Sequence, residues 1–242
     1  GGAAPRVTGE VRTVQGRYRA WGQMLDVESG LIRFNGAYDN ASGCAGLIEL
    51  AKAMARAPQK PGRSMYFVFT TAEESGLLGS EYFVAHPPIP PAQMAANINV
   101  DGLNYLGPTR DMVMLGSDRS SLGPMLEAIL ERRGRTLGRD THPERGYFFR
   151  SDHFPMAKAG VPALSLSEPK EFTGPDAAAL LARQEEYNGK DYHQPSDEYN
   201  PSWDFSGGVD DLKVIAELAW QIAAAPGMPT YNEGDQFANV RK

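Results

Sequence analysis

Two adjacent glutamates, Glu73 and Glu74, follow an apolar run in the stretch FTTAEESGLLGSEYF (69–83). Acidic side chains are common in the first turn of a helix, where they interact with the helix dipole. A solvated pair at a helix start is therefore the ordinary structural interpretation. The alternative is chemical, because two neighbouring carboxylates can divide two tasks, such as binding a metal and transferring a proton. The rest of the chain has to decide between the two.

Three further polar residues lie at the ends of expected strands and helices. They are Asp39 in NGAYDNASG, Asp101 in NINVDGLN and His193 in DYHQPSDEY. Each alone fits a turn or a helix cap, and Asn40 or Ser42 would cap a helix that starts at DNASG. Together with the glutamate pair they form a set of carboxylates and one imidazole, which is a ligand mixture that suits zinc and leaves one carboxylate for proton transfer.

The elements that must position these residues alternate between strands and helices. The run SMYFVFTT is β-branched and aromatic throughout and predicts a buried strand. The sequence predicts four strands, over residues 64–71, 95–101, 112–116 and 161–166. Helical spacing of apolar residues predicts helices over residues 43–57, 120–134 and 208–225. This alternation predicts an α/β fold, a three-layer sandwich with a central, mostly parallel mixed β-sheet flanked by helices. Ligands of such sheets gather at the carboxyl ends of strands, where the polar residues above lie.

The composition excludes several functional classes. The chain has 242 residues, 41% of them hydrophobic and 22% charged, which is typical of a globular protein with a sizeable core. Its net charge of −6 argues against a nucleic-acid partner, and no apolar run is long enough to span a membrane. A single cysteine, Cys44, excludes an internal disulfide and is expected to be a small core residue. The chain begins with Gly and shows no signal peptide.

Five ordered stretches resemble one family, the zinc-dependent exopeptidases that include bacterial leucyl aminopeptidases, glutamate carboxypeptidase and, as relatives, glutaminyl cyclases and the transferrin receptor. The stretches are NGAYDNASG, FTTAEESGLLGSEYF, NINVDGLN, RSDHFPMAKAGVPAL and YHQPSDEY, and they extend from about Arg33 to Pro201. No G-x-S-x-G, H-E-x-x-H or P-loop motif offers a rival chemistry.

The resemblance implies roles for the polar residues. Asp39 would bridge two zinc ions, Glu74 and His193 would bind one of them, and Asp101 would bind the other. Glu73, the glutamate that is not a ligand, would be the general base that takes a proton from a zinc-activated water and passes it to the leaving amine.

Three residues outside this set are assigned supporting roles. Asp152 and His153 fall where relatives place groups near the substrate, although Asp152 fits a helix N-cap equally well. Asp197, four residues after His193, is a candidate carboxylate for orienting that imidazole.

The chain departs from the family pattern upstream of Asp39. Family enzymes carry a His-x-Asp motif there, whose His binds the second zinc ion, but residues 1–38 contain no His. His86 and His142 lie in stretches that predict surface loops. We therefore expect at most one tightly bound zinc ion, low or absent activity without excess metal, and a sheet whose N-terminal part is incomplete. His153 is the nearest candidate to replace the missing ligand.

These observations predict three segments: a divergent or truncated N-terminal segment (1–30), a zinc exopeptidase catalytic domain (31–226) and a C-terminal extension (227–242). Within the domain, residues 168–207 lack apolar periodicity and predict a long functional loop. The predicted function is an aminopeptidase acting on peptide substrates. The alternatives are an inactive family member that serves as a binding or scaffold domain, and a single-zinc enzyme similar to glutaminyl cyclase. The resemblance favours a secreted or periplasmic location.

Overall fold

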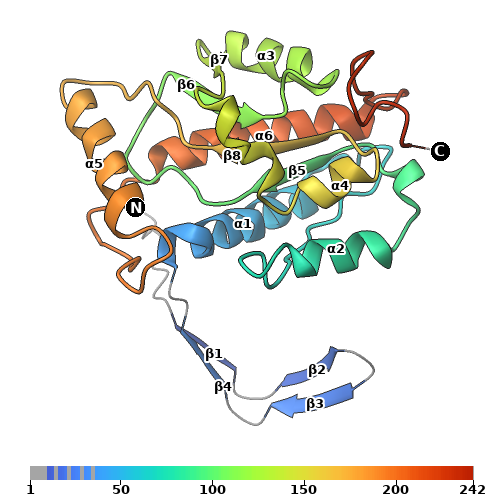
Figure 1. Ribbon diagram of the computed structural model, residues 1–242, viewed down its shortest axis with the longest axis horizontal. Helices are drawn as coiled ribbons and strands as arrows, with labels where there is room; N and C mark the ends of the chain where they lie inside the picture. Colours follow the sequence, from blue (N-terminus) through green and yellow to red (C-terminus); the bar gives the residue numbers. More distant parts are fainter. Residues whose placement is uncertain (1–9, 14–15, 21–22, 28–29, 34–35, 242) are drawn as a thin grey trace.

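The computed structural model describes residues 10–13, 16–20, 23–27, 30–33 and 36–241, and its central element is a four-stranded mixed sheet (Figure 1). The strands are β5 (Asn97–Val100), β6 (Asp111–Leu115), β7 (Thr136–Gly138) and β8 (Ala163–Ser167), in the order β5-β8-β6-β7. The pairs β5–β8 and β6–β7 are parallel, whereas β6 and β8 are antiparallel. The predicted α/β class and mixed sheet are confirmed, and β7 is the strand that the sequence pattern missed.

Helices cover both faces of this sheet. They are α1 (Gly43–Arg56), α2 (Leu78–Ala85), α3 (Leu122–Arg132), α4 (Phe154–Lys158), α5 (Ala177–Lys190) and α6 (Ser206–Ala224), with short turns η1 (Ala37–Ser42), η2 (Pro91–Gln93), η3 (Pro143–Arg145) and η4 (Tyr147–Phe149). The three long helices predicted from apolar periodicity correspond to α1, α3 and α6.

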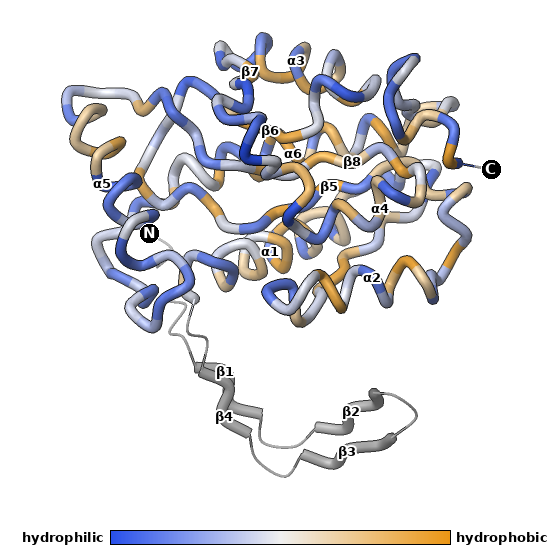
Figure 2. The backbone as a smooth tube through the Cα atoms, in the orientation of Figure 1, coloured by the Kyte–Doolittle hydropathy of each residue, from blue (hydrophilic) through white to orange (hydrophobic). Residues whose placement is uncertain are grey.

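The alternation of side chains along β6 separates the two apolar layers. Met112 and Met114 point into one core, which holds the apolar faces of α1, α3 and α6. Val113 and Leu115 point into a second core with Ala157 of α4. Figure 2 shows the hydrophobic positions concentrated on the strands and on the helix sides that face them. This three-layer packing fixes the strand ends, which in turn fix the residues that follow them.

The C-terminal extension is part of the second core rather than a loose surface tail. Tyr231 and Phe237 are buried there, and Tyr231 donates a hydrogen bond from its hydroxyl to the carbonyl of Val161 at 2.9 Å. Arg119 forms an ion pair with Asp235 at 2.9 Å. The extension therefore contributes to the stability of the sheet.

The prediction of a buried strand over residues 64–71 is wrong in part. The structure assigns no strand to this segment, and Tyr66, Val68 and Phe69 are 54%, 37% and 51% exposed. Phe67 still packs against the larger core. A continuous apolar run is typical of a strand inside a sheet whose two faces are both covered, and no strand among the described residues pairs with this segment.

The prediction of a long functional loop over residues 168–207 is wrong in part, because α5 lies within it. Its sequence AAALLARQEEYNGK is rich in residues with high helix propensity but has only a weak apolar stripe. The helix packs against the small apolar cluster of Tyr105, Leu106 and Phe172, and its buried positions are Gln184 and Tyr187. Intrinsic propensity, rather than amphipathic periodicity, was the signal that could have located it.

Residues before Gly36 contain four short strands outside the main sheet. They are β1 (Glu10–Thr13), β2 (Gly16–Ala20), β3 (Gln23–Val27) and β4 (Gly30–Arg33), paired β1–β4 and β2–β3. The predicted divergent segment 1–30 falls partly on residues outside the described ranges, and the division at residues 30 and 226 stays a prediction. In the part of the chain that the structure describes, no helix has the length and apolar character needed to cross a bilayer.

Candidate metal centre

Asp39 lies in the turn η1, directly before α1. The backbone at Asp39 and Asn40 departs from helical geometry, so the Asp39 side chain emerges from an irregular turn rather than from a regular helix face. Buried Asp197 fixes this turn, since its carboxylate accepts hydrogen bonds from the backbone N–H groups of Tyr38 at 3.1 Å and Asp39 at 3.1 Å. The carbonyl of Asp197 also accepts bonds from Gly36 and Ala37. Asp39 is thereby positioned by a residue 158 positions away.

Glu73 and Glu74 begin the turn that leads from the extended segment 64–71 into α2. Ala72 has a positive φ of 56°, which turns the chain sharply just before the pair. The carbonyl of Glu73 accepts hydrogen bonds from the N–H groups of Gly76 and Leu77, which closes the turn. The two carboxylates thus lie on a tight turn at the end of an extended segment, as the sequence predicted.

His193 lies in the loop after α5, with a positive φ of 58°. Such a backbone conformation is costly for a non-glycine residue and is typical of residues held for a function. Its ring stacks on Tyr192, with 3.7 Å between ring centroids. The stacking fixes one face of the imidazole and leaves its ring nitrogens at the edge.

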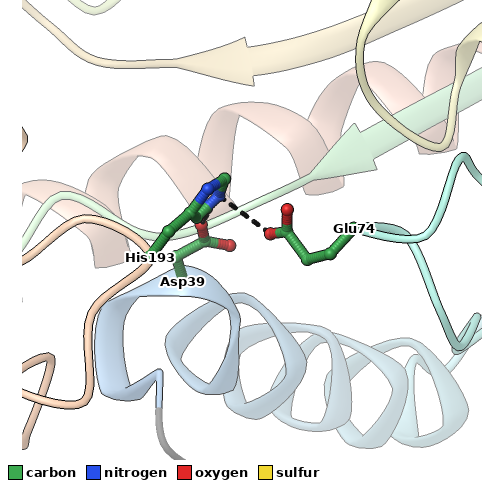
Figure 3. A group of neighbouring side chains, drawn as sticks. All are labelled: Asp39, Glu74 and His193. Carbon is green, nitrogen blue, oxygen red and sulfur yellow. Dashed lines mark ion pairs between the residues drawn. The ribbon is translucent and has the colours of Figure 1, made fainter.

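The structure brings Asp39, Glu74 and His193 together from three distant parts of the chain (Figure 3). One ligand atom of each lies within 4.8 Å of the others. Nε2 of His193 is 2.8 Å from Oε1 of Glu74 and 3.3 Å from Oδ2 of Asp39. Three protein ligands are the usual complement of a catalytic zinc ion, and carboxylate oxygens and imidazole nitrogens are among the donors that zinc accepts, so this set fits zinc.

Asp101 follows β5, as predicted, but it is not a member of this three-residue cluster. Its Oδ2 accepts a hydrogen bond from the Ser151 hydroxyl at 2.8 Å. Asn99 donates to the same hydroxyl at 2.9 Å. Ser151 lies within the stretch RSDHF but was not singled out, because a lone serine in a loop carries no distinguishing pattern.

The carboxylates of the centre raise one another's pKa values. Burial, with the nearby charges of Asp101 and Glu74, raises the pKa of Asp39 to about 6. Burial also raises the pKa of Asp101, against the opposing effect of its hydrogen bond from Ser151. Like charges held close together in a partly desolvated site favour a bound cation, since the cation relieves both the repulsion and the desolvation.

Glu73 has the most strongly shifted pKa of the resolved carboxylates at the centre. Burial raises it to about 8, and the charges of Asp101, Glu74 and Asp152 add to the effect. Asp152 accepts a hydrogen bond from the hydroxyl of Thr70 on Oδ2, while its buried Oδ1 has no partner among the residues described. The roles of Glu73 and Asp152 near the reacting groups stay predictions.

His153 lies apart from the three-residue cluster, where it is buried and its ring packs against Phe148 at 4.8 Å, so its role as a replacement ligand stays a prediction. Asp197 does not orient His193, since the described hydrogen bonds of its carboxylate come from the Tyr38 and Asp39 backbone and from the Tyr187 hydroxyl. A spacing of four residues suggested the wrong partner because the loop turns Asp197 inward.

Comparisons with known proteins place the chain in a family. Residues 20–214 match the family described as Peptidase family M28. The chain is 28% identical over 212 residues to leupeptin-inactivating enzyme 1 of Streptomyces exfoliatus, covering 85% of this chain and 45% of that protein. It is 26% identical to a probable zinc metalloprotease of Pyrenophora tritici-repentis, covering 81% of this chain and 50% of that protein.

Solved structures show the same fold. The LapA aminopeptidase of Legionella pneumophila superposes with a TM-score of 0.60 at 22% identity, over 81% of this chain and 48% of its own. An aminopeptidase from Aneurinibacillus sp. strain AM-1 gives a TM-score of 0.56 at 21% identity, over 78% and 40%. The chain thus spans about half the length of the relatives that it matches.

Proposed function

The chain belongs to Peptidase family M28, and from this premise we propose that it is a zinc-dependent aminopeptidase that removes residues from the free amino ends of peptides. The observation that carries the proposal is the convergence of Asp39, Glu74 and His193 to within 4.8 Å, with Glu73 next to one of them in the chain. Relatives described as an aminopeptidase and a zinc metalloprotease support the reaction class.

Each residue has a role that its position supports. Asp39, Glu74 and His193 would hold the zinc ion, which supplies Lewis-acid catalysis and lowers the pKa of water. Glu73 would accept a proton from the zinc-activated water and return it to the leaving amine, since a bound cation would offset the burial and the neighbouring carboxylates that raise its pKa and would keep it ionised. Asp101 and Ser151 form a hydrogen-bonded pair beside them. The clustered acidic residues also complement the positive charge of a free amino terminus; they are Asp39, Glu73, Glu74 and Asp101.

The test is the release of free amino acids from aminoacyl-anilides and from peptides with free amino ends, with zinc supplied in excess. Release that disappears with EDTA and with Glu73→Gln is the expected result. Absence of release from a folded, zinc-loaded sample would contradict the proposal and favour the alternative of a binding or scaffold domain.

A second candidate is single-zinc chemistry similar to that of glutaminyl cyclase. It is favoured by one observation, namely that the ligand cluster contains three residues and leaves Asp101 hydrogen-bonded to Ser151. Peptides with N-terminal glutamine distinguish cyclase activity from aminopeptidase activity. Cyclisation releases ammonia and leaves the peptide bonds intact, whereas an aminopeptidase releases free glutamine.

A further inference from the structure

A cavity of about 580 Å³ opens at the carboxyl ends of the parallel strands β6 and β7, which α3 connects (Figure 1). We call it the β6–β7 cavity. Its lining comes from residues 114–149, and neither Glu73 nor any of the three clustered zinc ligands belongs to it. The carboxyl ends of strands are a common place for ligands in α/β proteins, and the volume lies in the range of roughly 300–1,000 Å³ that is usual for small-molecule sites.

Arg119 is held in a fixed position in the wall of the β6–β7 cavity. Its Nη2 forms the ion pair with Asp235 at 2.9 Å, and its Cζ lies 4.9 Å from the ring centroid of Phe148 and 5.2 Å from that of Phe237. Its Nε has no hydrogen-bond partner among the residues that the structure describes. A guanidinium has several N–H donors, and one that is already fixed loses little freedom on binding, so Arg119 is suited to hold a carboxylate.

Two further features of the β6–β7 cavity favour a negatively charged group. Arg139, an exposed residue directly after β7, lines the same cavity. The first turn of α3 lines it with Gly123 and Pro124, and the N-terminal end of a helix carries a partial positive charge. Two guanidinium groups and a helix start therefore favour a ligand that carries a carboxylate.

Acidic side chains line the β6–β7 cavity as well, namely Asp118, Glu127 and Asp140. They do not neutralise the arginines, because the ion pair of Arg119 is formed with Asp235, and none of the ion pairs among the described residues joins Arg139 to these carboxylates. An inorganic anion would use only the arginines and would be repelled by the three carboxylates. A ligand with both signs of charge complements the lining better.

Apolar side chains complete the β6–β7 cavity. They are Met114, Leu115, Leu137, Phe148 and Phe149. Phe149 is 41% exposed, so part of this apolar surface is open to a ligand. A mainly apolar wall with a few polar groups that fix orientation is the usual composition of a site for a small organic molecule.

From this composition we infer that the β6–β7 cavity binds a small zwitterion with an apolar side chain, that is, a free amino acid or a dipeptide. Its carboxylate binds Arg119 and Arg139, its ammonium group binds Glu127, and its side chain packs on Phe148 and Phe149. The site is separate from the metal centre, and the inference does not rest on the proposed function.

The test titrates the zinc-loaded Glu73→Gln chain, which should not consume a dipeptide, with ligands that differ by one charge. The probes are phenylalanine, phenylalanine amide without the carboxylate, N-acetylphenylalanine without the ammonium group, and the dipeptide Phe-Leu. Calorimetry should show phenylalanine binding roughly 10- to 100-fold more tightly than either capped form, because each capped form loses one charge-assisted contact. Tighter binding of phenylalanine than of Phe-Leu identifies a free amino acid as the ligand, and the reverse order identifies a dipeptide.

Substitutions at exposed positions assign the two charges of the ligand. Arg139→Gln should weaken phenylalanine binding about 10-fold without weakening that of phenylalanine amide, which has no carboxylate to lose. Glu127→Gln should weaken phenylalanine binding by a similar factor without weakening that of N-acetylphenylalanine. Arg145→Gln and Glu131→Gln are the matched controls, because both residues are exposed and neither lines the cavity, and they should leave all affinities unchanged.

Four results would overturn the inference. Absence of binding by every probe would leave the cavity without a ligand of this class. Equal affinity for phenylalanine and its capped forms would exclude recognition of a zwitterion, and tighter binding of N-acetylphenylalanine would make the cavity an anion site. Loss of binding in His193→Ala would place the ligand at the metal centre. No part of this test measures hydrolysis, so a failure of the proposed function is scored separately.

Discussion

Asp197 and Asp39 are joined by a hydrogen bond of 3.1 Å from the backbone N–H of Asp39 to Oδ2 of Asp197. Asp197 is 2% exposed and also accepts hydrogen bonds from Tyr38 and from the Tyr187 hydroxyl. One buried carboxylate thus ties the loop after α5, which carries His193, to the turn that carries Asp39. Two of the three candidate zinc ligands depend on this connection for their relative position.

Asp197→Asn should weaken both the fold and the metal centre. The amide keeps one acceptor oxygen where the carboxylate offered two, so at least one buried N–H loses its partner, at a cost of about 1–3 kcal/mol. Zinc affinity should fall by roughly 10- to 100-fold, as is typical when a group supporting a ligand is changed. Denaturant unfolding and zinc calorimetry measure the two effects. Asp191→Asn, whose hydrogen bond from Ser196 lies at the surface, is the matched control and should change neither.

Glu73→Gln and Glu74→Gln should separate proton transfer from metal binding. Glu73→Gln keeps the three clustered ligands and should bind zinc normally while lowering turnover about 10²- to 10⁴-fold, the range of a positioned proton carrier. Glu74→Gln removes the charge of a ligand and should weaken zinc binding itself. Kinetics at saturating zinc, together with zinc calorimetry, distinguish them. Exchanged phenotypes would mean that the roles of the two glutamates are reversed.

His153 should make the stability of the fold depend on pH. Burial lowers its pKa to about 4, from an ordinary value of 6.5, so the fold favours the neutral ring. Between pH 6.5 and 4 the unfolded chain binds more protons than the folded one, and the stability falls as the pH falls through this window, by roughly 3 kcal/mol in total.

His153→Phe removes the titrating group and keeps an aromatic ring beside Phe148, so the decline in stability between pH 6.5 and 4 should become shallower. Denaturant unfolding at several pH values measures the slope, and His142→Phe, at an exposed position, is the control that should retain it. An unchanged slope in His153→Phe would show that other groups cause the acid sensitivity.

The sequence predicted those helices and strands that are marked by a pattern within their own residues. Helices α1, α3 and α6 carry apolar stripes, and in β5, which precedes Asp101, Ile98 and Val100 alternate with asparagines, so these elements could be located from periodicity alone. The state of segment 64–71 could not be predicted, because a strand forms only beside a partner strand and the segment's own sequence does not show whether that partner is present. Likewise the backbone N–H of Asp39 donates a hydrogen bond to Asp197, 158 positions away, a pairing that spacing along the chain does not indicate.

The last prediction concerns the number of zinc ions. Asp39, Glu74 and His193 form a three-ligand cluster that already uses the imidazole of His193, and Asp101, outside this cluster, accepts a hydrogen bond from the Ser151 hydroxyl. Two carboxylates without a nitrogen donor bind zinc weakly, so we expect one tightly bound ion per chain. Elemental analysis after dialysis should find one zinc, and calorimetry should find that His193→Ala loses it while Asp101→Asn retains it. Because zinc binds the folded chain, EDTA should lower the unfolding temperature of the unsubstituted protein and of Asp101→Asn, but not that of His193→Ala. If two zinc ions per chain remain bound after dialysis, this prediction is wrong. The second ion would then need a ligand that neither the sequence nor the described geometry identifies.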